Sequence, residues 1–104
     1  LMIIIMLQHD KHHILNGFEI SGHSGYDEAG SDIVCAAVSA LAQTALLGLM
    51  KYVPDAVKYD MQDGFLSVHV DPCSDASPQI ILETMKLGLE QIARQYESYV
   101  VFDS

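Results

Sequence analysis

Several residue types are scarce in this sequence of 104 residues, which has no tryptophan, three prolines, two cysteines and five basic residues. Cys35 and Cys73 are too few for the disulfide framework of a small secreted domain, and their spacing matches no metal-binding pair. The 14 acidic residues give a net charge of -9, which opposes binding to a phosphate backbone. We therefore expect no nucleic-acid partner. The acidic surface suits a basic protein or serves solubility alone.

The apolar segments raise the questions of export and of membrane insertion. Residues 2–8 (MIIIMLQ) have no basic flank and no small-residue cleavage site, so we expect no export signal and a reducing, cytoplasmic compartment. Residues 33–50 carry no charge and reach the length of a membrane span. They also contain Ser39, Gln43, Thr44 and many alanines. We expect a helix buried on several sides of a folded domain and no membrane contact.

The apolar pattern predicts one α+β domain over residues 1–104, with elements in the order ββαββαβ. Half of the residues are hydrophobic, which suffices for a modest core. A mixed, mainly antiparallel sheet that carries two helices is the economical packing. The expected strands are 2–8, 14–22, 57–62, 65–70 and 98–103, and the expected helices are 32–51 and 78–96.

Short motifs predict where these elements begin. The Asp-Gly pair at 63–64 is a strong signal for a tight hairpin between two strands. Ser31 or Asp32 is the expected N-cap of the first helix. Ser77, followed by Pro78, is the expected N-cap of the second helix.

The spacing of apolar residues also predicts which faces are buried. In the second strand, Ile14, Phe18 and Ile20 share one face. The first helix is apolar nearly all round and needs more cover than one sheet face and one helix provide, which favours a homo-oligomer. The expected buried stripe of the second helix is Ile81, Met85, Leu89, Ile92 and Tyr96.

His23 and Cys35 are candidates for a base and a nucleophile. A thiolate is the attacking form of cysteine, and a nearby imidazolium or a helix N-terminus favours it. His23 ends the second strand, and with Ser31 as N-cap Cys35 lies at the edge of the first helical turn. In a straight strand His23 faces away from Phe18, but Gly22 allows the chain to bend there.

Two further residues share the cysteine's side of the helix. Asp32, Cys35 and Ser39 are spaced at i, i+3 and i+7. Asp32 could orient His23 as the third member of a triad orients its base, or it could satisfy N–H groups at the helix start. Ser39 could hydrogen-bond within the site or back to its own helix.

Plain structural explanations stand beside these roles. A cysteine in an alanine-rich helix is usually a packing residue, and a strand-end histidine usually a hydrogen-bonding one. Residues 9–13 (HDKHH) could ligate a divalent metal, but they fall where a turn is needed and such clusters are commonly solvated. His69 is expected to be exposed, and Cys73 has no visible partner.

Residues 17–41 (GFEISGHSGYDEAGSDIVCAAVSAL) closely resemble the signature of the ribosomal-processing cysteine protease family, Prp. The resemblance lies in Gly22-His23, in Gly25-Tyr26 and in the run DIVCAAVS at 32–39, with the matching interval from histidine to cysteine. The chain length and the element order fit the family as well. Ser24 departs from the alanine that is usual after the histidine, a small-for-small change.

The resemblance implies a cysteine endopeptidase that removes a short N-terminal extension from the bacterial large-subunit ribosomal protein L27. It makes Cys35 the nucleophile and His23 the base, with Gly22, Asp32 and Ser39 in support. It also implies a homodimer and calls for no cofactor or metal. The alternative hypothesis is a non-enzymatic ribosome-assembly protein that binds basic partners through its acidic surface.

Overall fold

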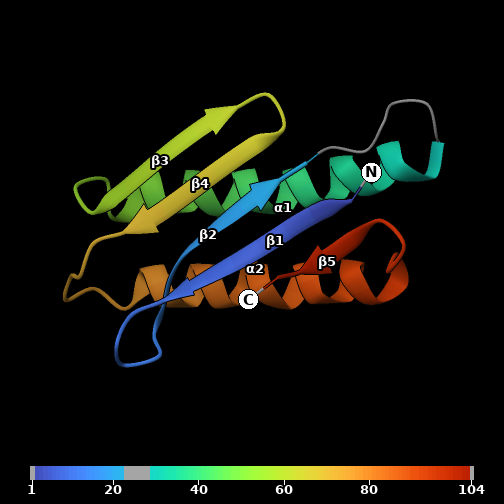
Figure 1. Ribbon diagram of the computed structural model, residues 1–104. Helices are drawn as coiled ribbons and strands as arrows, with labels where there is room; N and C mark the ends of the chain where they lie inside the picture. Colours follow the sequence, from blue (N-terminus) through green and yellow to red (C-terminus); the bar gives the residue numbers. More distant parts are fainter. Residues whose placement is uncertain (1, 23–28, 104) are drawn as a thin grey trace.

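The chain forms five strands and two helices in the order ββαββαβ over residues 2–22 and 29–103, the part that the structure, a computed structural model, describes (Figure 1). Side chains are described for the same residues except 29–32. The elements are β1 (Ile3–His9), β2 (Leu15–Ser21), α1 (Ala29–Tyr52), β3 (Val57–Gln62), β4 (Phe65–Val70), α2 (Ser77–Gln95) and β5 (Val100–Phe102).

The strands form one mixed sheet in the order β3-β4-β2-β1-β5. The pair β1 and β5 is parallel, and the other three pairs are antiparallel. Both helices lie behind the sheet in Figure 1, so they cover the same face. The predicted α+β fold is therefore confirmed. Fully buried side chains between the sheet and the helices include Ile5, Phe18, Leu49, Val68 and Leu82.

The helix α1 is long and apolar enough over Ile33–Tyr52 to cross a membrane by length and composition alone. One side of it packs into the core through fully buried residues such as Val34 and Leu49. On that side its apolar character is that of a core helix. The opposite side has no cover from the described residues, because Ile33 and Leu47 are 62% and 65% exposed.

The expected alternation is wrong at the start of β2. The pairing between β1 and β2 shifts register between Gln8 and His9, which leaves Asn16 as an extra residue in a β-bulge. The bulge reverses the alternation before it, so Leu15 is buried and Ile14 is exposed. Beyond the bulge, the predicted burial of the strand is confirmed.

The start of α2 also differs from the prediction. Its N-cap is Ala76, and Ser77 is the first helical residue. The N–H of Ser77 donates a hydrogen bond to Oδ1 of Asp75 at 2.8 Å. This bond lowers the pKa of the Asp75 carboxyl, because it favours the charged form. Asp75, and not the Ser77 hydroxyl, thus accepts a hydrogen bond from an N–H group at the start of the helix.

The buried side of α2 is displaced from the expected stripe. Leu82 is fully buried although the stripe omits it, whereas Ile81 is only half-buried and Tyr96 is exposed. Leu82, Met85 and Leu89 are spaced at i, i+3 and i+7, so they share one side of the helix, and this is the side that is buried.

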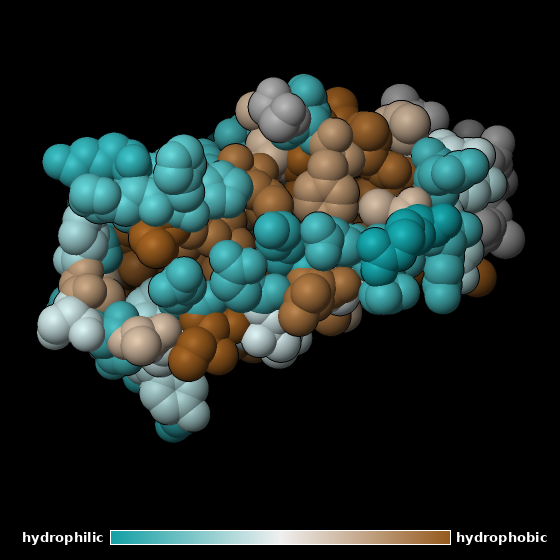
Figure 2. Space-filling view, turned by 90° about the horizontal axis from the view of Figure 1, so that it is seen from below, coloured by the Kyte–Doolittle hydropathy of each residue, from teal (hydrophilic) through white to brown (hydrophobic). Residues whose placement is uncertain are grey.

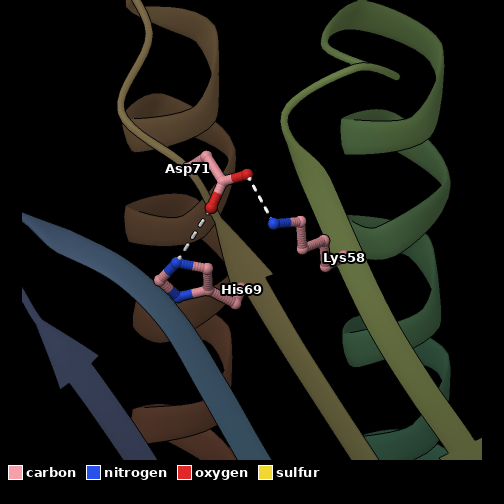
Figure 3. A network of polar contacts seen from close by, with 3 residues as sticks. All are labelled: Lys58, His69 and Asp71. Carbon is pink, nitrogen blue, oxygen red and sulfur yellow. Dashed lines mark ion pairs between the residues drawn. The ribbon is translucent and has the colours of Figure 1, made fainter.

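A small polar network closes the end of the β3–β4 hairpin that lies away from its turn (Figure 3). Asp71 contacts Nζ of Lys58 at 3.0 Å and Nε2 of His69 at 3.4 Å. The hydrogen bond from Lys58 holds the pKa of the Asp71 carboxyl below its ordinary value. The network accounts for His69 as a partly exposed residue that contacts Asp71, two residues further along the chain, while Lys58 reaches Asp71 from across the hairpin.

The observed buried side of α2 predicts how two neighbouring substitutions affect stability. Leu82→Ala is expected to lower the free energy of unfolding by about 2–5 kcal/mol, because it leaves a cavity in the core. Ile81→Ala should cost less, since that side chain is half-buried. Chemical denaturation measures both, with the exposed Gln91→Ala as a control expected within about 0.5 kcal/mol of the unchanged protein. A larger loss for Ile81→Ala would contradict the observed packing.

Candidate active site

A cavity of about 280 Å³ lies between α1 and the tip of the β3–β4 hairpin. From α1 it is lined by Cys35, Ser39, Ala42 and Gln43. The end of β2 and the hairpin supply the other walls, formed by Ile20, Gly22 and residues 61–66. The cavity therefore brings together three of the five predicted site residues, Gly22, Cys35 and Ser39.

The packing of α1 explains why these side chains face the cavity. Val34 and Val38 are buried in the core and fix the rotation of the helix about its axis. Cys35 and Ser39 each follow one of these valines, so they lie on the adjoining side of the helix, half-buried. Ala42 continues that side one turn further, and its short side chain leaves room beside the sheet.

Gly22 shapes the other wall of the cavity. Its φ of +86° belongs to the left-handed region, and a Cβ at this position would clash with the carbonyl oxygen of Met2. Its N–H donates a hydrogen bond to the carbonyl of Gly64, in the hairpin turn, at 3.0 Å. The expected bend at Gly22 is thus confirmed, and it occurs where the chain leaves the sheet toward His23.

The position of Cys35 in its helix corrects the prediction. Because α1 begins at Ala29, before either expected N-cap, Cys35 is its seventh residue. The field of a helix N-terminus falls off within the first turn. Cys35 therefore lies beyond the turn in which a helix N-terminus favours a thiolate.

For the other two predicted residues, His23 and Asp32, the structure describes at most the backbone. His23 and the following residues 24–28 lie outside the described residues. Asp32 belongs to the backbone of α1, but its side chain lies outside them too. His23 directly follows Gly22, which lines the cavity, so the chain enters the undescribed segment from the wall of the site.

The histidine-rich segment at 9–13 forms a turn held by Asp10. Oδ1 of Asp10 accepts hydrogen bonds from the N–H groups of His12 at 2.7 Å and Ile14 at 3.1 Å. These bonds, that of Ile14 foremost, lower the pKa of the carboxyl. Among the described residues, no group of three or more histidine, cysteine or acidic side chains could hold a metal ion.

The second thiol occupies a different setting. Cys73 is free and exposed in the loop before α2, and its Sγ lies 3.8 Å from the carbonyl oxygen of Asp75. Cys35 is also free, but it is half-buried and lines the cavity. The two thiols therefore differ in both exposure and surroundings.

The hairpin wall of the site is what the sequence reasoning missed. Met61, Gln62 and Phe65 line the cavity beside Cys35, together with the turn at 63–64. The Asp-Gly signal predicts the hairpin itself. It carries no information on which part of α1 the tip contacts, because that depends on the strand order of the whole sheet.

Comparison with known proteins connects this geometry to a family. A family model described as cysteine protease Prp matches residues 2–101. The protein named ribosomal processing cysteine protease Prp from Staphylococcus aureus (strain Mu50 / ATCC 700699) is 32% identical over 84 residues, or 78% of each chain. The protein of the same name from Bacillus subtilis (strain 168) is 31% identical over 100 residues, or 89% of this chain and 87% of its own.

Solved structures share the fold. A crystal structure of the ribosomal processing protease Prp from S. aureus, in complex with a substrate peptide, has a TM-score of 0.87 at 21% identity and covers 98% of both chains. The crystal structure of SMU.848 from Streptococcus mutans has a TM-score of 0.81 at 30% identity, over 98% of this chain and 92% of that one. A free thiol in a cavity, the matching family model and these relatives agree. The chain belongs to the Prp family of ribosomal-processing cysteine proteases, and it is a cysteine protease.

Proposed function

We propose that this protease removes a short N-terminal extension from ribosomal protein L27, with a dyad of Cys35 and His23. The observation that carries the proposal is the half-buried thiol of Cys35 in a cavity whose wall includes Gly22, the residue before His23. A relative from S. aureus is named for ribosomal processing, and a Prp from S. aureus has been crystallised with a substrate peptide. Those names support a ribosomal protein segment as the substrate.

The proposed mechanism gives His23 the activating role. Its imidazole takes the proton from Sγ of Cys35, and the thiolate attacks the scissile carbonyl to form a tetrahedral oxyanion. The imidazolium then donates that proton to the leaving amine as the peptide bond breaks. Water, with its proton taken by His23, hydrolyses the thioester and regenerates the thiol. No cofactor or metal takes part.

Ser39 and Asp32 have supporting roles in this proposal. Ser39 lies one turn after Cys35 on the same side of α1 and lines the cavity, so its hydroxyl is placed to hydrogen-bond near the thiol or the bound peptide. Asp32 precedes Cys35 by one turn, and its carboxylate would orient His23 and stabilise the imidazolium. The net charge of -9 favours the approach of a basic ribosomal protein.

The protein is further proposed to act as a cytoplasmic homodimer, in the compartment where ribosomal proteins are made. The outer side of the helix layer offers the interface, since Ile33, Leu47, Ile80 and Leu87 are 62%, 65%, 64% and 64% exposed. Figure 2 shows the molecule from the edge where α2 lies, with the sheet and helix layers seen side-on, and hydrophobic side chains lie between hydrophilic ones on that edge. Burying such residues against a second copy removes apolar area from water.

The nucleophile is tested by substitution. Cys35→Ala is expected to reduce cleavage of a synthetic peptide that spans the N-terminal extension of L27 by at least about 10³-fold, because the other thiol, Cys73, lies outside this cavity. Chromatographic detection of the two products measures the rate. Cys73→Ser is the matched control and should cleave normally. Normal cleavage by Cys35→Ala would remove the assignment. Salt-sensitive binding of the peptide without any cleavage would favour the non-enzymatic alternative.

The base is tested by thiol reactivity in the native protein. At neutral pH, iodoacetamide should label Cys35 at least about tenfold faster than Cys73, although Cys73 is the more exposed thiol. His23→Ala should abolish that advantage and leave the labelling of Cys73 unchanged. Peptide mapping by mass spectrometry follows both sites. Slower labelling of Cys35 than of Cys73 would mark it as a packing residue and sink the dyad.

The dimer interface is tested by placing a charge on it. Leu47→Glu should shift the protein from dimer to monomer in sedimentation equilibrium, because a carboxylate would be buried in an apolar contact. Ile14→Glu, at an exposed apolar position in the turn after β1, is the control and should leave the mass unchanged. A monomeric mass for the unsubstituted protein at micromolar concentration would refute the proposed interface.

A further inference from the structure

The strand β3 forms one edge of the sheet, and some of its main-chain N–H and C=O groups have no hydrogen-bond partner among the strands of the sheet. It has β4 as its neighbour on one side and no strand of the sheet on the other. The carbonyl of Ala56 accepts the N–H of Asp71 across the hairpin, whereas the N–H of Val57 donates to Val53, away from β4. Main-chain groups of successive strand residues point to opposite sides. Tyr59 and Met61 therefore direct their N–H and C=O groups to the free edge.

The side chains of the same two residues are exposed apolar groups. Tyr59 and Met61 are 50% and 47% exposed. They face Val68 and Leu66 across the hairpin, both of which are buried under the helices. Tyr59 and Met61 thus point toward the helix side of the sheet, but at the edge where α1 does not cover them.

This edge is continuous with the candidate active site. Met61 lines the cavity that contains Cys35, and so do Gln62 and the hairpin turn after it. A polypeptide that lay along β3 and passed beyond Gln62 would enter this cavity. In Figure 1, β3 is the outermost strand on its side of the sheet, and its arrow runs toward the hairpin tip.

The charges of the hairpin favour a basic occupant. Asp60 and Asp63 are exposed on β3 and in its turn. Lys58 is the cation of this strand, and it is engaged with Asp71 at 3.0 Å. The carboxylate of Asp60 has a neutral neighbour, Nε2 of Gln62 at 3.1 Å, and that contact leaves its charge in place. An arginine- or lysine-rich segment would meet unneutralised carboxylates here.

We propose that β3 binds the substrate as an added strand. An extended basic segment, several residues from the scissile bond, hydrogen-bonds the main chain at Tyr59 and Met61, and the polypeptide continues past the hairpin tip to Cys35. Strand addition of this kind draws its affinity from main-chain bonds and its selectivity from side-chain contacts. The proposal rests on the proposed protease function and extends it with a docking site outside the cavity.

Amide hydrogen exchange tests the docking without any need for cleavage. The protein carries Cys35→Ala, and the probe is the synthetic peptide that spans the N-terminal extension of L27 and the residues after it. In the free protein the N–H groups of Tyr59 and Met61 should exchange rapidly, and those of Asp60 and Gln62, which face β4, slowly. Saturation with the peptide should slow exchange at Tyr59 and Met61 by at least about tenfold, because each N–H gains a partner. Unchanged exchange at both residues, with the peptide bound or with no binding at all, would overturn the proposal.

A pair of variants at Tyr59 distinguishes the contribution of its main-chain N–H to peptide binding from that of its side chain. Tyr59→Pro removes the ring together with the N–H that points to the free edge, a position that tolerates proline, and Tyr59→Thr removes the ring alone. Tyr59→Pro should raise KM for the long peptide several-fold and leave kcat unchanged, whereas Tyr59→Thr, which retains the N–H, should raise KM less. An equal effect of the two variants would assign the contact to the ring and contradict strand addition. The exchange experiment decides the matter if Tyr59→Pro fails to fold.

The outcomes also separate this proposal from the protease function on which it rests. Protection at Tyr59 and Met61, combined with no cleavage of the same peptide by the unsubstituted protein, would leave the docking site standing and remove the L27 assignment. Cleavage without protection would remove the docking site alone. Protection that appears without peptide and grows with protein concentration would show that the occupant is a second copy of the chain, and would likewise overturn the proposal.

Discussion

The packing of α1 against the sheet is the constraint on which the rest of the site depends. Val34 and Val38 lie in the core and set the rotation of the helix. Cys35 and Ser39 are the residues that follow them, so their direction toward the hairpin is a consequence of core packing. The thiol of Cys35 is thus carried by a helix whose other side is held in place by burial in the core.

The same packing places Cys35 some distance from the start of its helix. Cys35 is the seventh residue of α1, beyond the turn in which a helix N-terminus favours an anion. Many reactive cysteines sit at that terminus, where unpaired N–H groups stabilise the thiolate. In this protein the cavity instead receives its polar groups from several elements, among them the end of β2 and the hairpin turn. The proposed mechanism accordingly assigns the activation of Cys35 to a neighbouring base rather than to the helix start.

Local patterns predicted most of the fold, and their failures have physical causes. Alternation and the Asp-Gly turn gave the bounds of β3 and β4 correctly, because both signals are local. The bulge at Asn16 was missed, since it depends on register with a neighbouring strand. Leu82 was left out of the buried stripe because the sheet, and not α2 alone, decides which side of the helix is covered. In the site, a sequence motif identified Gly22, Cys35 and Ser39, but the hairpin wall comes from strand order, which no local pattern encodes.

The hydrogen bond between Gly22 and Gly64 joins two walls of the cavity. It ties the end of β2 to the hairpin turn at 3.0 Å, next to the last ladder pair, Ser21 and Phe65. The wall at Gly22 and the wall at the hairpin turn are therefore directly bonded to each other. The end of β2 and the hairpin turn thus form one continuous, main-chain-bonded wall of the cavity, opposite the side that α1 supplies.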